Sequence, residues 1–146
     1  VGVEFEKAQR IAEQRTDWIK KQLRKFSQSK AKQIFKKPDG AELITIKKYL
    51  RNRVEHLAKR HGFQFNKVSF KNMKTRWGSC SPKNNISFNI LMAHLPKKFQ
   101  DYIILHELLH TRIKDHKKGY WAELDRLTGD VNGIHKELKE KYTFYN

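Results

Sequence analysis

The chain of 146 residues is long enough for one domain with its own core and too short for two domains of ordinary size. Its 12% of aromatic residues and several periodic apolar stretches argue against a disordered chain. A single cysteine, Cys80, excludes an internal disulfide framework, and no apolar run approaches the roughly 18 residues that a membrane-spanning helix needs. We therefore expect a cytoplasmic protein without a membrane span, whose oligomeric state the sequence leaves open.

The chain is strongly basic, because 32 Lys and Arg against 15 Asp and Glu give a formal net charge of +17. Self-repulsion of that size is best tolerated when an anionic partner is nearby. Residues 20–37 contain eight basic residues and no acid, and they are the place where we expect a nucleic acid or another polyanion to bind. A solvated basic face explains the same charge equally well, since charge alone does not show that a surface recognises a nucleic acid.

In chain order, the first predicted element is a long amphipathic helix over about residues 3–26, where apolar residues recur at three- and four-residue steps. Residues 27–40 are polar, basic and rich in turn formers toward their end, which predicts a loop. A second helix follows, with Gly62 as its C-terminal cap. Its apolar stripe consists of Leu43, Ile46, Leu50, Val54 and Leu57.

The apolar period changes toward two between Phe63 and Met92, which predicts strands. Residues 65–70 form one run and residues 86–90 the other. The segment between them is rich in turn formers, so we expect the two runs to pair antiparallel around an irregular connection.

Pro96 stands just inside the start of the next predicted helix, about residues 97–113, where its missing N–H costs nothing. Another helix over about residues 117–127 follows, and Gly129 breaks its pattern. Spaced apolar residues then predict a last short helix. These residues are Val131, Ile134 and Leu138.

Helices that flank a small antiparallel sheet make the predicted fold class α+β. We expect a single domain over residues 1–146. Within it we distinguish an N-terminal helix and basic loop (1–40), a catalytic core (41–128) and a C-terminal helix and tail (129–146).

The main motif is HExxH, which spans His106 to His110. Residues four apart lie about 40° apart around a helix and one turn along it, so both imidazoles can reach one ion. Glu107 is offset by about 100° from His106, which places its carboxylate beside the ion as a proton acceptor. The surrounding residues are apolar, and a buried carboxylate is costly unless a divalent metal compensates it. The alternative is a pair of hydrogen-bonded core histidines and a Glu107–lysine ion pair.

A catalytic zinc needs a third protein ligand beside an open position, and His116 is the best candidate. On a continuous helix His116 would lie about 240° away from His110, so the chain must bend before it. Asp115 would then cap a new helix that opens at His116. Glu123 is the reserve ligand or a hydrogen-bond partner of one. His116 as a surface histidine among lysines remains the other interpretation.

Several further polar and aromatic residues have both a functional and a structural interpretation. Candidates for stabilising an oxyanion are Tyr120, His94, Asn89 and Arg76, and the sequence does not choose among them. We expect Trp77 and Trp121 to pack in the core rather than stack on substrate. Cys80 is expected to be a small buried residue, because no activating pair is visible.

These residues resemble the YgjP-like metal-dependent hydrolases, which are classed with the zincin metallopeptidases. The likeness runs from about residue 18 to residue 127 and is carried by three stretches: Arg76–Ser81, Asn89–Pro96 leading into Asp101–His110, and Asp115-His116 with Tyr120-Trp121. The resemblance implies a zincin-like fold, Zn²⁺ as cofactor and peptides or proteins as substrates. It also implies a histidine at the position of His116 as the third ligand.

The chain departs from the family pattern at a few positions. The family commonly has Asn and Ser on either side of the histidine where this chain has Asp115 and Lys117, and Phe where it has Tyr120. Members generally also carry a β-rich segment ahead of the first helix, and we expect that segment to be missing here. Similar HExxH-plus-His spacing occurs in WLM-like and SprT-like proteases, which work on DNA-bound proteins. Metzincins require Gly where this chain has Ile113.

The leading prediction is a zinc-dependent hydrolase, most simply a metallopeptidase with metal-activated water and Glu107 as general base. One alternative is a nucleoside triphosphate pyrophosphatase, since the family has been associated with that chemistry and a basic surface favours phosphates. The sequence contains no Gly-rich phosphate loop. The other alternative is a nucleic-acid-associated module with a structural metal, although structural zinc sites are usually rich in cysteine.

Overall fold

The computed structural model describes residue 10, residues 13–21 and residues 38–142. The chain divides into two compact units, Val1–Ile34 and Phe35–Asn146, and each is described by itself. The predicted single domain over the whole chain therefore stays a prediction.

In the first unit, residues 13–21 are helical, in agreement with the helical pattern of the sequence there. Trp18 and Ile19 are exposed on this helix. Lys20 and Lys21 are exposed as well, but the rest of the basic stretch lies outside the described residues. Nucleic-acid binding through residues 20–37 is therefore still a prediction.

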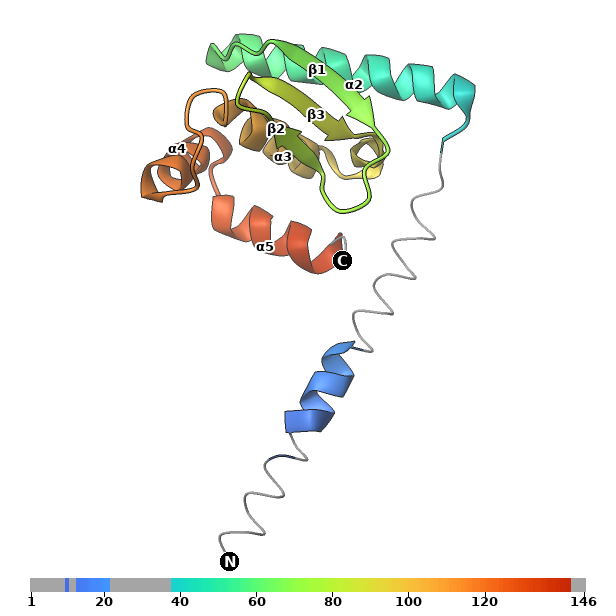
Figure 1. Ribbon diagram of the computed structural model, residues 1–146, viewed down its shortest axis with the longest axis vertical. Helices are drawn as coiled ribbons and strands as arrows, with labels where there is room; N and C mark the ends of the chain where they lie inside the picture. The colour runs from blue at the N-terminus through green and yellow to red at the C-terminus, as the bar shows by residue number, and fades with distance from the viewer. Residues whose placement is uncertain (1–9, 11–12, 22–37, 143–146) are drawn as a thin grey trace, which may run out of the picture. The chain divides into compact units, whose positions relative to one another are not determined.

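The second unit combines helices with a three-stranded sheet (Figure 1). In chain order its elements are α2 (Gly40–His61), β1 (Lys67–Lys71), β2 (Gly78–Cys80), β3 (Asn85–Asn89), the 3₁₀ helix η1 (Ile90–His94), α3 (Lys97–Leu109), α4 (Lys118–Thr128) and α5 (Val131–Lys141). The predicted α+β class is confirmed. In the described part of the chain, none of the helices combines the length and the apolar character that crossing a membrane requires.

The sheet is mixed, and the prediction that its two apolar runs pair antiparallel was wrong. β3 is the central strand, with β1 parallel to it on one side and β2 antiparallel to it on the other. The connection from β1 to β3 contains the short strand β2, so the chain reverses its direction twice between them. β3 therefore runs parallel to β1, whereas a simple hairpin would have made the two antiparallel. The hairpin is instead formed by β2 and β3, and Asn84 in its turn has a φ of 61°, which asparagine tolerates.

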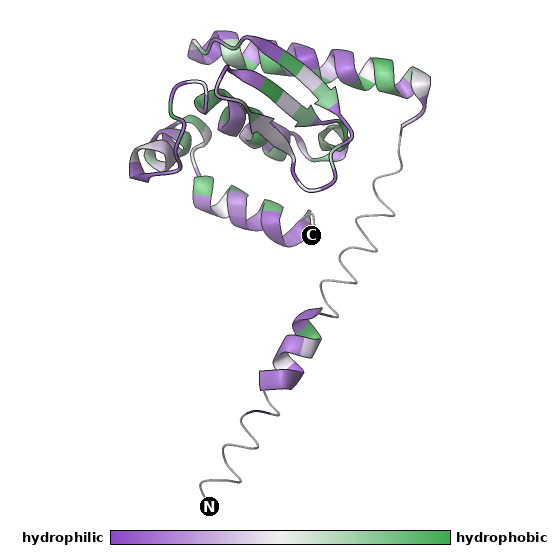
Figure 2. Cartoon of the chain, in the orientation of Figure 1, coloured by the Kyte–Doolittle hydropathy of each residue, from purple (hydrophilic) through white to green (hydrophobic). Residues whose placement is uncertain are grey.

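Alternating side chains give the sheet one buried and one polar face. Phe70 and Phe88 are opposite each other on β1 and β3, and their rings stack with centroids 6.0 Å apart. Ser69 and Ser87 lie on the other face and share a hydrogen bond of 3.0 Å. Figure 2 shows the resulting alternation of hydrophobic and hydrophilic bands along the strands. The core also takes in residues from α2 and α3, among them Leu50, Val54, Ile104 and Leu108.

α2 has a well-defined end on each side. At its start, Asp39 Oδ1 accepts a hydrogen bond from Glu42 N and Glu42 Oε2 accepts one from Asp39 N, which makes a capping box. At its end, Gly62 has a φ of 69° and its N–H donates to the carbonyls of Ala58 and Lys59. The predicted glycine cap is therefore confirmed, and the chain leaves the helix directly into the core residue Phe63.

We expect Gly62→Ala to destabilise the protein by about 1 kcal/mol, because a residue with a Cβ disfavours the left-handed backbone. The added Cβ would lie 3.6 Å from Arg112 Nη2, an ordinary contact, so the cost is conformational rather than steric. Urea denaturation measures the loss. Gly40→Ala is the matched control, since nothing lies within 4 Å of its Cβ position. Equal stability of the Gly62→Ala and wild-type proteins would show that the cap does not need glycine.

Candidate active site

α3 places the HExxH motif in the centre of the second unit. A helix that is apolar nearly all round is buried, and α3 contacts α2, α4, α5 and β2. Glu107 and His110 are only 7% and 8% exposed, and His106 is half-buried. The three polar residues of the motif thus lie within a mostly apolar environment.

The chain bends after α3, as the prediction for His116 required. α3 ends at Leu109, four residues earlier than its apolar pattern indicates. Thr111 Oγ1 donates to the carbonyl of Leu108 (2.6 Å), and His110 Nδ1 donates to the carbonyl of Ile113 (2.9 Å). Side-chain hydrogen bonds of this kind compete with helical ones and stabilise the turn.

The predicted N-cap role of Asp115 was wrong. α4 begins at Lys118, and its N-cap is Lys117 without a side-chain hydrogen bond. Asp115 Oδ1 instead accepts a hydrogen bond from Lys117 N (3.1 Å). This local turn, of the kind that aspartate favours, orders the segment that carries His116, so the helix starts two residues later than predicted.

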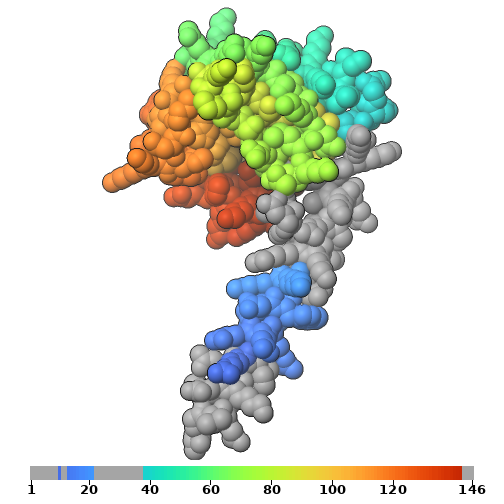
Figure 3. All heavy atoms as spheres, in the orientation of Figure 1, coloured from blue at the N-terminus to red at the C-terminus, as the bar shows by residue number. Residues whose placement is uncertain are grey.

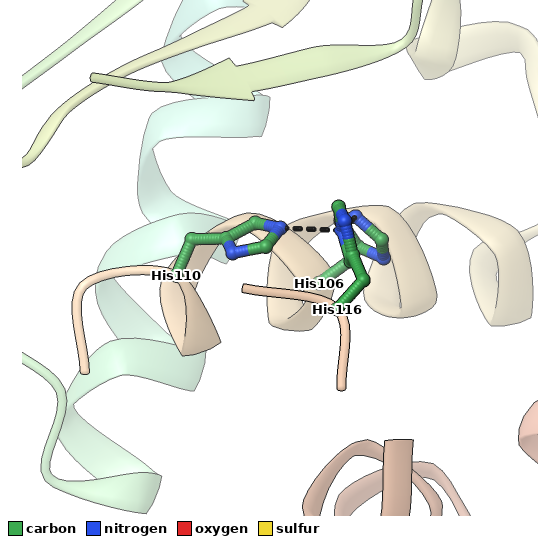
Figure 4. Close-up of side chains that lie close together, drawn as sticks. All are labelled: His106, His110 and His116. Carbon is green, nitrogen blue, oxygen red and sulfur yellow. Dashed lines mark hydrogen bonds between the residues drawn. The ribbon is translucent and has the colours of Figure 1, made fainter. Parts of the chain in front are cut away.

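The three predicted ligands come together, and their rings point toward one another (Figure 4). His110 Nε2 lies 2.8 Å from His116 Nε2, which lies 3.4 Å from His106 Nε2. One ligand atom from each residue lies within 4.8 Å of the other two. In a tetrahedral zinc site with bonds of about 2.0–2.1 Å, neighbouring nitrogens are about 3.3 Å apart. The observed spacing therefore fits a metal ion among the three rings.

The protonation of His106 and His110 also fits metal binding, because neutral imidazole is the form that ligates metals. Burial, helped by the neighbouring His110 and His116, lowers the pKa of His106 to about 3. Burial likewise lowers the pKa of His110. Because His110 donates its Nδ1 proton to Ile113, its Nε2 keeps a lone pair for an ion.

Two aromatic side chains of α4 hold the histidines in place. Tyr120 is fully buried and stacks on the His110 ring, with centroids 4.6 Å apart, and its hydroxyl donates to the carbonyl of His106 (2.9 Å). Trp121 stacks on the His116 ring (5.6 Å), and its Nε1 donates to the carbonyl of His116 (2.9 Å). The Tyr120 hydroxyl, a candidate oxyanion stabiliser from the sequence, is thus already engaged by the backbone. Trp121 positions the third histidine.

Asn89, another residue singled out in the sequence, has structural partners. Asn89 is fully buried, and its Nδ2 donates to the carbonyls of Met73 and Arg76 while its Oδ1 accepts from Leu91 N. It therefore caps η1 and holds the segment before β2.

The reserve ligand Glu123 lies outside the histidine group. Both of its oxygens accept hydrogen bonds from Arg126, at 2.6 and 3.0 Å.

Cys80 is half-buried on β2, and burial raises the pKa of its thiol, in agreement with the expectation of an unreactive cysteine. His94 lies on η1 and is exposed.

Glu107 lies directly against the edge strand β2. A Cβ on Gly78 would be 2.8 Å from Glu107 Cγ, so only glycine allows this close approach. Burial raises the pKa of Glu107 to about 7, and the positive charge of Arg76 opposes part of that rise. A carboxyl group with a pKa near the working pH is suited to proton transfer. Sequence reasoning missed Gly78, because it predicted an irregular connection there, and a glycine indicates close contact only once it is known to lie in a strand.

A cavity of about 170 Å³ adjoins His106 and Glu107. Its other lining residues are Trp77, Gly78, Tyr102, Ile103, His135 and Leu138. The Tyr102 hydroxyl and His135 Nδ1 share a hydrogen bond of 2.9 Å. No local pattern in the sequence indicated His135, because this residue reaches the site only through the packing of α5 against α3.

An α+β core that presents an HExxH helix and three converging imidazoles defines a zincin-type metal-dependent hydrolase. The chain belongs to the YgjP-like family, since the model of the YgjP-like metallopeptidase domain matches residues 44–141. It is therefore a metallopeptidase-like hydrolase whose family implies a catalytic metal and peptide or protein substrates. A comparison with curated protein sequences found no match.

Two solved structures share the fold. The metallopeptidase zymogen jannalysin of Methanocaldococcus jannaschii is 22% identical, covers 63% of this chain and 95% of its own, and has a TM-score of 0.55. The metallopeptidase zymogen abylysin of Pyrococcus abyssi is also 22% identical, covers 64% of this chain and 94% of its own, and has a TM-score of 0.56. At this identity the likeness shows the fold alone.

Proposed function

We propose that the protein is a zinc-dependent metallopeptidase in which His106, His110 and His116 hold the metal and Glu107 is the general base. The convergence of three imidazole nitrogens beside a buried carboxylate is the observation that supports this most. Three nitrogen ligands leave one position of a tetrahedral zinc open, as catalytic sites require, whereas closed structural sites are usually rich in cysteine.

When bound, zinc would supply Lewis-acid activation of water and of the scissile carbonyl. Glu107 accepts the proton of the attacking water and passes it to the leaving amine. Its raised pKa, near 7, suits both transfers. Tyr120 and Trp121 keep the rings of His110 and His116 oriented toward the common centre.

The side chains beside the carboxylate favour peptides over nucleotides as substrates. The cavity at Glu107 is lined chiefly by aromatic and aliphatic residues, Trp77, Ile103 and Leu138 among them. Such walls suit an apolar side chain of a peptide. None of the described residues that line this one cavity is a Lys or Arg, and a triphosphate beside Glu107 would require cations or backbone N–H groups there.

Metal analysis and hydrolysis assays on one preparation test the proposal. We expect about one equivalent of zinc per chain, and peptide hydrolysis that a chelator abolishes and added zinc restores. The same preparation is assayed with nucleoside triphosphates. Hydrolysis of triphosphates without hydrolysis of peptides, or peptide hydrolysis that survives complete metal removal, would contradict the proposal.

We expect Gly78→Ala to lower kcat/KM for a peptide by about 10- to 100-fold, because a displacement of the reacting group by about 1 Å has a cost of that order. The new Cβ would meet Glu107 Cγ at 2.8 Å, so the carboxylate must move. Metal content should stay the same, since the three atoms nearest to the new Cβ all belong to Glu107. Gly119→Ala is the control, because nothing lies within 4 Å of its Cβ position. Unchanged kinetics in the Gly78 variant would show that the position of Glu107 is not critical.

A further inference from the structure

The cavity at Glu107 continues along α5. A second cavity, of about 210 Å³, shares Trp77, His135 and Leu138 with the first. Because the same side chains line both, the two cavities adjoin each other between residues 75–78 and α5, and we call them together the α5 groove. Figure 3 shows the red surface of α5 next to the yellow-green surface of the sheet region.

The end of the α5 groove away from the histidines is cationic. Arg76 and Lys139 line it, and none of the described residues that line it is acidic. Neither of these two side chains makes a hydrogen bond or an ion pair with another described residue. On α5, the carboxylate of Glu137 is occupied by Lys98 and Lys141, so it does not neutralise Lys139. Within the described part of the chain, two positive charges therefore line this cavity without an acidic partner.

The two ends of the groove are close enough for one short peptide. Arg76 directly precedes Trp77, which lines both cavities, and it stands two residues before Gly78, whose Cβ position lies 2.8 Å from Glu107 Cγ. Trp77 and Leu138 line both cavities, so apolar surface connects the cavity beside His106 with the cavity beside the two cations. Guanidinium and ammonium groups bind carboxylates by charge-assisted hydrogen bonds, and apolar walls strengthen such pairs by excluding water.

We propose that the α5 groove selects peptides with an apolar side chain next to the scissile bond and a carboxylate a few residues away, which Arg76 and Lys139 bind. This inference rests on the proposed peptidase function and names its substrate class. The carboxylate comes from an acidic side chain or from the C-terminus of a peptide.

Three acetylated peptides of one length separate these sources. The first contains Leu-Asp-Asp and ends in an amide, the second contains Leu-Asn-Asn and ends in an amide, and the third contains Leu-Asn-Asn and ends in a free carboxylate. We expect the full-length zinc-loaded protein to hydrolyse the first or the third at least about 10-fold better than the second, as two charge-assisted hydrogen bonds allow. The preferred peptide identifies the source of the carboxylate.

Arg76→Gln and Lys139→Gln should each lower the ratio of kcat/KM for the preferred peptide to kcat/KM for the neutral amide by about 3- to 10-fold. The double variant should lose the preference. Lys59→Gln is the matched control, because it removes a charge from α2 at a residue that lines neither cavity. The preference of the wild-type protein should also weaken at high salt.

Binding of the same peptides to zinc-loaded Glu107→Gln protein, followed by fluorescence anisotropy, gives a readout without hydrolysis. Tighter binding of the carboxylate peptide, lost with Arg76→Gln, supports the inference. Metal-dependent hydrolysis with equal rates for all three peptides would overturn it while the proposed function stands. Absence of hydrolysis for every peptide would count against the proposed function. The binding comparison would still show whether the α5 groove prefers the carboxylate peptide.

Discussion

Glu107→Gln is expected to abolish peptide hydrolysis and to leave the metal bound. Glutamine has the size of glutamate but cannot accept the proton of the attacking water, and the loss of a positioned general base lowers rates by about 10²–10⁴-fold. The fold should tolerate the change, because burial already disfavours the charged form of this carboxyl group. Steady-state kinetics and metal content, measured on one preparation, check both parts of the expectation.

Glu123→Gln is the matched control for this variant. It changes the same functional group on α4, where Glu123 pairs with Arg126 on a partly exposed surface. We expect full activity and full metal content. Wild-type rates in the Glu107 variant would rule out its role as the base, and loss of metal from the Glu123 variant would make Glu123 a ligand.

His116→Ala is expected to weaken zinc binding by at least about 100-fold. Loss of a residue that only hydrogen-bonds to a ligand lowers metal affinity by up to about 100-fold, and loss of a direct ligand should cost at least as much. His116 is exposed on the segment before α4, so the fold should survive its loss. His106 on α3 and His110 at its C-cap would remain as ligands, and two ligands hold the ion less tightly than three. Titration with zinc in a competing chelator measures the change in Kd.

Thermal and chemical unfolding give a second readout of the same variant. Zinc at about 100 times its Kd should stabilise the wild-type protein by about 2.7 kcal/mol, because it binds only the folded state. The same zinc concentration should stabilise His116→Ala far less. His56→Ala, at an exposed position on α2, is the control and should behave as wild type. An unchanged Kd in His116→Ala would assign the third ligand to another group.

The helix that carries His106, Glu107 and His110 was predictable because its information is local. The 3.6-residue repeat places the two histidines on one face, and the apolar residues around them predict burial. Gly62 was predictable as a cap for the same reason, since the left-handed conformation at a helix end favours glycine. In both cases a few neighbouring residues suffice to specify the structure.

The mixed sheet and the start of α4 were not predictable in this way. Parallel pairing of Val68 with Ile86 depends on β2, whose three residues carry no periodic signal. The start of α4 depends on whether Asp115 caps a helix or closes a local turn, and both uses suit aspartate. Such choices are made by long-range packing, which compensates for weak local preferences.

The sequence by itself determined the α+β class, the HExxH helix and the need for a bend that lets His116 reach it, because spacing along a helix is a local property. Only the tertiary structure decided that Gly78 presses against Glu107 and that His135 and Lys139 of α5 lie along the same groove. Those contacts join residues far apart in the chain, and their positions depend on how α5 and β2 pack against α3.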